Sequence, residues 1–170
     1  VTDMRGMFAN CRSMTCLDVT GFDTSNVTNM GSQIIETTDG IEYWDGLGMF
    51  EDCENLINLD LSGFDTHNVT NMARMFEGCC MLENLDLSGF DTNNVTDMEL
   101  MFFGCESLES LNLSGFDMKN VSDTKGMFYG CNSLQVIDVP LNVHAGISDA
   151  KLPATFYSSE GVEYENLPVE

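Results

Sequence analysis

Apolar residues recur along this chain with a period of 26 residues. The tetrapeptide Ser-Gly-Phe-Asp begins at Ser62, Ser88 and Ser114. A variant that begins at Thr20 stands 42 residues before the first of these, which is one period plus 16 residues. Self-similarity at a fixed period indicates a repeat architecture, in which each unit buries its apolar side chains against the next unit. In the third repeat the recurring apolar positions are Met72, Met75, Phe76, Cys79, Leu82, Leu85, Leu87, Phe90 and Val95.

Each repeat contains two kinds of apolar spacing. From Met72 onward the apolar residues follow the spacing of a helix, whereas Leu85 and Leu87 alternate as in a strand. Thr96 precedes the helical pattern of the fourth repeat and forms a capping box with Glu99. The pattern therefore predicts a repeat solenoid, built from a short helical turn plus a short parallel strand in each unit.

The period also divides the chain into segments. Five repeats occupy residues 1–140, and the second repeat carries an insert over about residues 31–48 that we expect to form a hairpin turning at Asp39-Gly40. Residues 141–170 leave the pattern, and their two short apolar runs predict a C-terminal hairpin cap. The first repeat has no equivalent cap, so we expect a monomer or a weak association through that end.

Charge excludes two classes of partner. The chain has 28 acidic and six basic residues, which give a formal net charge of −22. Nucleic-acid binding and docking on anionic lipid both need a basic surface, so neither is expected. No apolar run reaches the length of a membrane span, so we expect no direct membrane insertion. Cations and basic proteins remain compatible with the charge.

The repeat unit resembles a known family. The pattern Leu82-x-x-Leu85-x-Leu87 is that of a leucine-rich repeat. The full unit, from Asn68-Val69-Thr70-Asn71-Met72 to Leu87-Ser88-Gly89-Phe90-Asp91-Thr92, resembles the 26-residue repeat of BspA-like bacterial surface proteins. The resemblance implies a right-handed leucine-rich-repeat array in an extracellular, cell-surface protein. Relatives in that family are often described as adhesins or host-interaction proteins, and the family has no catalytic motif to transfer.

Five cysteines share one column of the repeat, on the inward side of the predicted turn. They are Cys11, Cys53, Cys79, Cys105 and Cys131. We favour a file of buried thiols that pack as small hydrophobic groups. A disulfide between adjacent repeats stays an alternative, because the stacking distance suits a bridge. A zinc site is not expected, because local Cys-x-x-Cys pairs are absent.

Two polar columns are candidates for ladders or binding. One has the glycosylation sequence Asn-Val-Thr/Ser, which we interpret as an internal amide ladder, at Asn26, Asn68, Asn94 and Asn120. The other places Asp18, Asp60 and Asp86 on the outward side of the strands, as candidate binding residues. Stacked carboxylates make calcium an alternative ligand. The glycine-aspartate motif of calcium-binding rolls is absent, however, so we expect no metal and no cofactor.

The insert holds Tyr43 and Trp44, and the latter is the only tryptophan of the chain. These rings either fold back over the repeats or form a protruding contact, and they are candidate binding residues.

His67 and His144 pair with no nucleophile that the sequence identifies, so we expect no enzyme. We expect instead an adhesin-like module that recognises an unidentified host or matrix protein. The alternative is a structural spacer that presents another domain of a surface protein.

Overall fold

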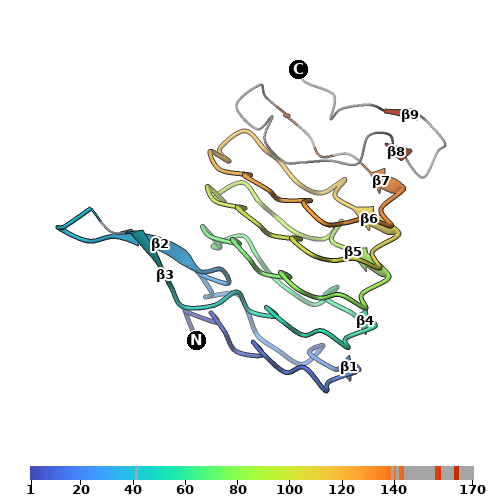
Figure 1. Ribbon diagram of the computed structural model, residues 1–170, viewed down its shortest axis with the longest axis horizontal. Coiled ribbons are helices and arrows are strands. Elements are labelled where there is room, and N and C mark those ends of the chain that lie inside the picture. The colour runs from blue at the N-terminus through green and yellow to red at the C-terminus, as the bar shows by residue number, and fades with distance from the viewer. Residues whose placement is uncertain (41, 139, 141, 144–155, 158–162, 165–170) are drawn as a thin grey trace.

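The computed structural model describes residues 1–40, 42–138, 140, 142–143, 156–157 and 163–164. In this part of the chain the repeats lie one upon another as successive layers, with their strands in a column along one side (Figure 1). Parallel bridges join equivalent residues of successive layers, at Asp3, Asn29, Asn71, Asp97 and Asp123. The period of the sequence is therefore the step from one layer to the next.

The strands are short, and most of them pair in parallel. They are β1 (Cys16–Leu17), β2 (Gln33–Glu36), β3 (Glu42–Asp45), β4 (Asn58–Leu59), β5 (Asn84–Asp86), β6 (Ser110–Asn112), β7 (Val136–Asp138), β8 (Phe156–Tyr157) and β9 (Glu163–Tyr164). β1 pairs with β4, and β5, β6 and β7 form one parallel sheet in which Leu85 faces Leu111. No ladder joins β4 to β5, so the strand column is divided there. β8 continues in parallel from β7, and β9 pairs antiparallel with β8, where the sequence predicted a hairpin.

The predicted helix-plus-strand leucine-rich-repeat solenoid is wrong. The described residues contain no helix, so they include no helix that is long and apolar enough to cross a membrane. In the third repeat the N–H groups alternate between two kinds of acceptor. Met75 donates to Met72, three residues back, whereas Phe76 donates to Met101 of the next layer at 2.9 Å. A helix needs every N–H for its own turn, so stacked turns replace it here.

The expected helix caps are also absent. The hydroxyl of Thr96 donates to the carbonyl of Thr70, one layer back, rather than accepting a hydrogen bond from an N–H of its own turn. The carboxylate of Glu99 lies near Lys125 instead of closing a capping box. One position of each repeat has a left-handed backbone that closes a turn of the stack; its residues are Asn10, Asp52, Gly78, Gly104 and Gly130.

The core is continuous from layer to layer. All nine recurring apolar positions of the third repeat are buried, as the periodicity predicted. One column of phenylalanine rings stacks with centroids 5.5 to 5.7 Å apart, at Phe8, Phe50, Phe76, Phe102 and Phe128. Each layer therefore covers the apolar side of its neighbour, and this burial supplies the main stabilisation.

The insert forms the expected hairpin from β2 and β3, and it projects from the side of the stack away from the strand column (Figure 1). Two glycines mark the points where it leaves and rejoins the second layer. A Cβ atom on Gly31 would lie 2.3 Å from the nitrogen of Ala73, and one on Gly48 would lie 1.9 Å from the oxygen of Arg74. Only glycine allows the third layer to approach so closely at these two positions.

Candidate interaction surfaces

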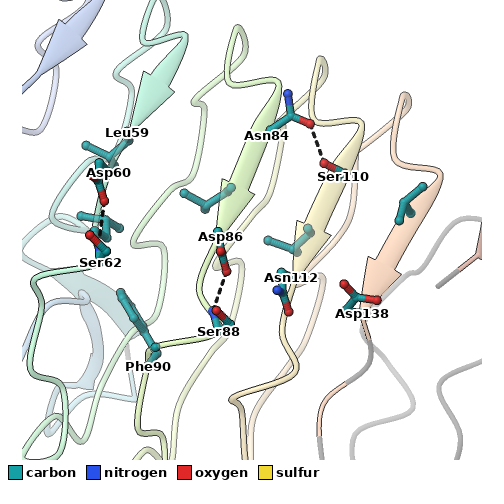
Figure 2. A pocket seen from close by; sticks show the side chains of 15 residues that line it. Leu59, Asp60, Ser62, Asn84, Asp86, Ser88, Phe90, Ser110, Asn112 and Asp138 are labelled. Carbon is teal, nitrogen blue, oxygen red and sulfur yellow. Dashed lines mark hydrogen bonds between the residues drawn. The ribbon is translucent and has the colours of Figure 1, made fainter. Parts of the chain in front are cut away.

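A shallow groove of about 550 Å³ runs over the strands β4, β5, β6 and β7. Figure 2 shows polar side chains along it, and each of these layers contributes at least one. Asp60, Asp86, Asn112 and Asp138 occupy equivalent positions there. The groove thus combines carboxylates with an apolar floor from the strand leucines. Of the carboxylates that the sequence singled out, Asp60 and Asp86 line the groove, whereas Asp18 lies in the first layer and does not line it.

The groove carboxylates also hold the turns that follow their strands. The N–H of Ser62 donates to Asp60 at 2.9 Å, and the N–H of Ser88 donates to Asp86 at 2.9 Å. Asn112 accepts from Ser114 in the same way, so an amide serves as well as a carboxylate. Hydrogen bonds from Ser62 lower the pKa of Asp60, which keeps this carboxylate charged.

Two further features that the sequence raised are metal-ligating side chains and the histidines. No three His, Cys, Asp or Glu side chains among them lie close enough to hold a metal ion. The ring of His67 contacts Asp65 and Asn68, both within its own turn. His144 lies outside the described residues. The chemistry available at the groove is hydrogen bonding and attraction of positive charge.

A second polar cluster lies at the base of the hairpin. The guanidinium of Arg74 packs 4.7 Å from the ring centre of Trp44, so the half-buried tryptophan lies against the third layer. Arg74 also pairs with Glu51 at 2.9 Å and with Glu77. The side chain of Tyr43 lies outside the described residues, although its backbone pairs in the hairpin.

Glu51 accepts a backbone hydrogen bond at the point where the insert rejoins the second layer. Ser32 of the insert donates its N–H to the carbonyl of Ala73 in the third layer. The N–H of Gly48 donates instead to the carboxylate of Glu51 at 2.8 Å. Burial raises the pKa of Glu51, and the nearby charge of Arg74 counteracts that effect. The carboxylate, the arginine and the tryptophan together fix the hairpin to the layers.

Four cysteines of the predicted file are buried, and each thiol donates to a phenylalanine carbonyl of the preceding layer. Cys79 and Cys105, for example, lie 3.3 and 3.2 Å from the carbonyl oxygens of Phe50 and Phe76. Burial raises the pKa of Cys53 to about 11 and that of Cys131 to about 12. Cys11 departs from the predicted burial: it is exposed, because no described layer lies on its side of the first repeat. All seven cysteines are free thiols.

The asparagine column forms an amide-to-backbone ladder. Asn68, Asn94 and Asn120 each donate to a carbonyl of the preceding layer, at 2.7 to 2.8 Å. Asn26, in the first layer, donates to the hydroxyl of Ser25. Three of these amides therefore bond to the backbone of the preceding layer, but all four residues are exposed rather than internal.

A threonine ladder was not recognised from the sequence. The buried hydroxyl of Thr66 donates to the carbonyl of Asp91 and accepts from the N–H of the same residue. Thr24 and Thr92 make the same pair of bonds to the next layer. The recurrence of threonine directly after Gly-Phe-Asp was the available signal.

Comparison with known proteins gives one match. A family model described as "Mycoplasma protein of unknown function, DUF285" matches residues 1–46 and 44–144. Together the two matched segments span residues 1–144, which include the repeats and the whole insert. No curated protein and no solved structure matches the chain.

Proposed function

The chain belongs to the DUF285 family of Mycoplasma proteins of unknown function, and from that premise we propose that it is a non-enzymatic protein-recognition module of a cell-surface protein. The resemblance of its repeat unit to BspA-like surface proteins supports an extracellular, adhesin-like role. The partner in this proposal is a protein of a host cell or of the extracellular matrix.

The observation that carries the proposal is the groove over β4 to β7. Each of its layers contributes polar side chains, and Asp60, Asp86 and Asp138 are carboxylates there. An extended surface of this kind suits a long partner segment rather than a small molecule. With a net charge of −22 the chain attracts basic segments and repels acidic ones.

The test uses the purified chain carrying biotin, applied to cultured animal cells and to immobilised matrix proteins at physiological salt. The groove variant combines Asp60→Asn, Asp86→Asn and Asp138→Asn. Asn112 already shows that an amide can hold this turn, so the variant should fold. We expect its binding to fall about tenfold, because the groove loses three negative charges that attract the partner's basic groups.

A matched control makes the same change of charge elsewhere. Asp65, Asp91 and Asp117 accept the N–H group two residues on, just as the groove residues do, but they lie outside the groove. Their triple change to asparagine should leave binding within about twofold. Equal losses in both variants would indicate a general effect of charge rather than binding in the groove. A native chain that binds none of the surfaces would contradict recognition.

A structural spacer is the second candidate function. One observation favours it: the polar groups of the groove already bind their own turns, as Ser62 does to Asp60. The groove also lacks an exposed aromatic or arginine anchor of the kind that dominates binding energy at interfaces. A spacer predicts that the chain binds no host or matrix surface, yet is needed for exposure of the domains attached to it.

A further inference from the structure

The hairpin formed by β2 and β3 presents a strand edge outside the stack. Figure 1 shows it extending from the layers on the side away from the strand column. A two-stranded sheet has one unpaired edge on each strand. On β3 the carbonyl of Asp45 accepts from Arg5, whereas the described residues place no neighbouring strand beside β2. The edge of β2 is therefore the open one.

The side chains of β2 suit the addition of another strand. Its sequence, Gln33-Ile34-Ile35-Glu36, centres on two β-branched residues, which favour extended structure. Ile34 is 43% exposed, a large apolar side chain left open to solvent. Natural edges are usually protected by lysine, proline or a bulge, and β2 has neither lysine nor proline.

The hairpin is held in place at its base. An isolated two-stranded hairpin is marginally stable, so an open edge needs support. Arg5 pairs with Asp45 at 3.0 Å from the first layer, and Arg74 packs on Trp44 from the third. Two of the three arginines of the chain serve this purpose. An edge that is already ordered loses less conformational entropy when a partner pairs with it.

Charge identifies the occupant. Exposed Glu36 and Asp39 lie at the far end of the β2 edge, and the whole chain carries a net charge of −22. A second copy of the chain would bring the same charge, so like charges oppose hairpin-to-hairpin pairing. We propose that the edge of β2 binds an extended segment of a partner protein, with apolar residues at its centre and Lys or Arg at its ends, as a third strand. The inference rests on the proposed recognition function and names a second surface for it.

The probe is a display library of random ten-residue peptides, selected on the whole chain. We expect the selected peptides to combine β-branched or aromatic residues with at least two basic ones. Hydrogen exchange with a selected peptide bound should protect the amides of residues 33–36. Binding should weaken several-fold as salt rises from about 50 to about 300 mM, because the basic ends are screened.

Single substitutions test whether the selected peptide binds at the edge of β2. Ile34→Lys should weaken the selected peptide at least tenfold, and Glu36→Lys should weaken it several-fold while keeping the hairpin. Met81→Lys is the matched control, because Met81 is also 43% exposed but lies in a different turn. Trp44 fluorescence should stay unchanged in Glu36→Lys and Met81→Lys, which shows that the base of the hairpin is intact. Ile34 pairs with Trp44 across the hairpin, so the folding of Ile34→Lys is checked by hydrogen exchange of the hairpin without peptide.

Five results would overturn the inference. Two of them are selected peptides that lack basic residues, and equal binding of the selected peptide by Ile34→Lys and Met81→Lys. Protection at residues 58–62 and 84–88 instead of 33–36 would move binding to the groove and leave the proposed function standing. Sedimentation that shows dimers lost on Ile34→Lys would assign the edge to a second copy. A library that yields no binder contradicts peptide binding at the β2 edge but not the proposed recognition function, because the cell-binding experiment tests that function separately.

Discussion

The guanidinium of Arg74 lies 4.7 Å from the ring centre of Trp44, which joins the insert to the third repeat across 30 residues of sequence. Arg74 adopts a left-handed backbone with φ of 59°, at a position where the first and fifth repeats have Gly6 and Gly126. A side chain there carries a conformational cost that glycine avoids. The contacts of Arg74 with Trp44 and Glu51 offset that cost at the point where the insert meets the third repeat.

Trp44→Ala tests the packing of the hairpin base. We expect it to lower the free energy of unfolding by about 1–2 kcal/mol, through the lost cation–π contact and half-buried ring. Urea denaturation measures the loss. In the native chain Trp44 emission should be partly blue-shifted, and Arg74→Gln should make the ring easier to quench with acrylamide. Solvent-like emission with no loss of stability would instead favour the protruding-contact interpretation of Trp44.

Excision of single repeats separates the general role of a layer from the special role of Arg74. Removing residues 98–123 and removing residues 72–97 both preserve the period, so both shortened chains should fold with reduced stability. The second deletion also removes Arg74 and leaves buried Glu51 without its cation. We expect it to cost roughly 2 kcal/mol more in urea denaturation. Identical stabilities would show that the ion pair contributes nothing.

Thr66→Val tests the threonine ladder. Valine keeps the shape but removes the buried hydroxyl of Thr66, which leaves the N–H and carbonyl of Asp91 without a partner and should cost about 2–3 kcal/mol. Thr70→Val is the control, because Thr70 is exposed and its hydroxyl makes one bond, to Thr28. Its cost should stay below about 1 kcal/mol in the same denaturation experiment. Similar losses for both variants would contradict a ladder that depends on burial.

Thiol labelling tests the cysteine file. A disulfide reagent at about pH 8 should modify Cys11 and Cys16 quickly, because both residues are exposed to solvent. Cys53 and Cys131, with pKa values raised to about 11 and about 12, should react only after denaturation, as should the other two buried thiols. Mass spectrometry of the labelled peptides identifies the sites. Fast native labelling of Cys79 would place it outside the core.

Mild acid should stabilise the chain. Burial raises the pKa of Glu51, Asp97 and Glu99 above their unfolded values, so the folded state takes up protons first as the pH falls. Stability from these groups is present below the folded pKa and is lost as the pH rises through it. The melting temperature should therefore increase between about pH 7 and about pH 5. Glu99→Gln should reduce that increase, and the exposed control Glu106→Gln should reduce it less.

Stronger acid should have the opposite effect. Hydrogen bonds lower the pKa of exposed Asp18, Asp60 and Asp117 in the folded state. Their contribution is present above the unfolded pKa near 4 and is lost as the pH falls through the lower folded value. Thermal melts followed by circular dichroism should thus show a maximum near pH 5. A melting temperature that falls steadily from pH 7 would contradict the assignment of the buried carboxylates.

The chain's sequence alone determined which side chains are buried and where the repeat is interrupted. Met72, Phe76 and Leu85 recur at a fixed period, and burial of recurring apolar groups follows from the spacing itself. The hairpin of the insert was also predictable, because a turn at Asp39-Gly40 between two apolar runs is a local signal.

Tertiary structure decided how the backbone of each turn bonds. The spacing from Met72 onward places side chains on the inner side in a helix and in a stacked turn alike, so it does not choose between them. The choice depends on the acceptor that each N–H finds, and Phe76 finds Met101 in the next layer. Contacts between residues far apart in sequence also set the exposure of Cys11 and the cluster of Glu51 with Arg74. A periodic pattern specifies which residues repeat, whereas only the stacked layers specify their hydrogen-bond partners.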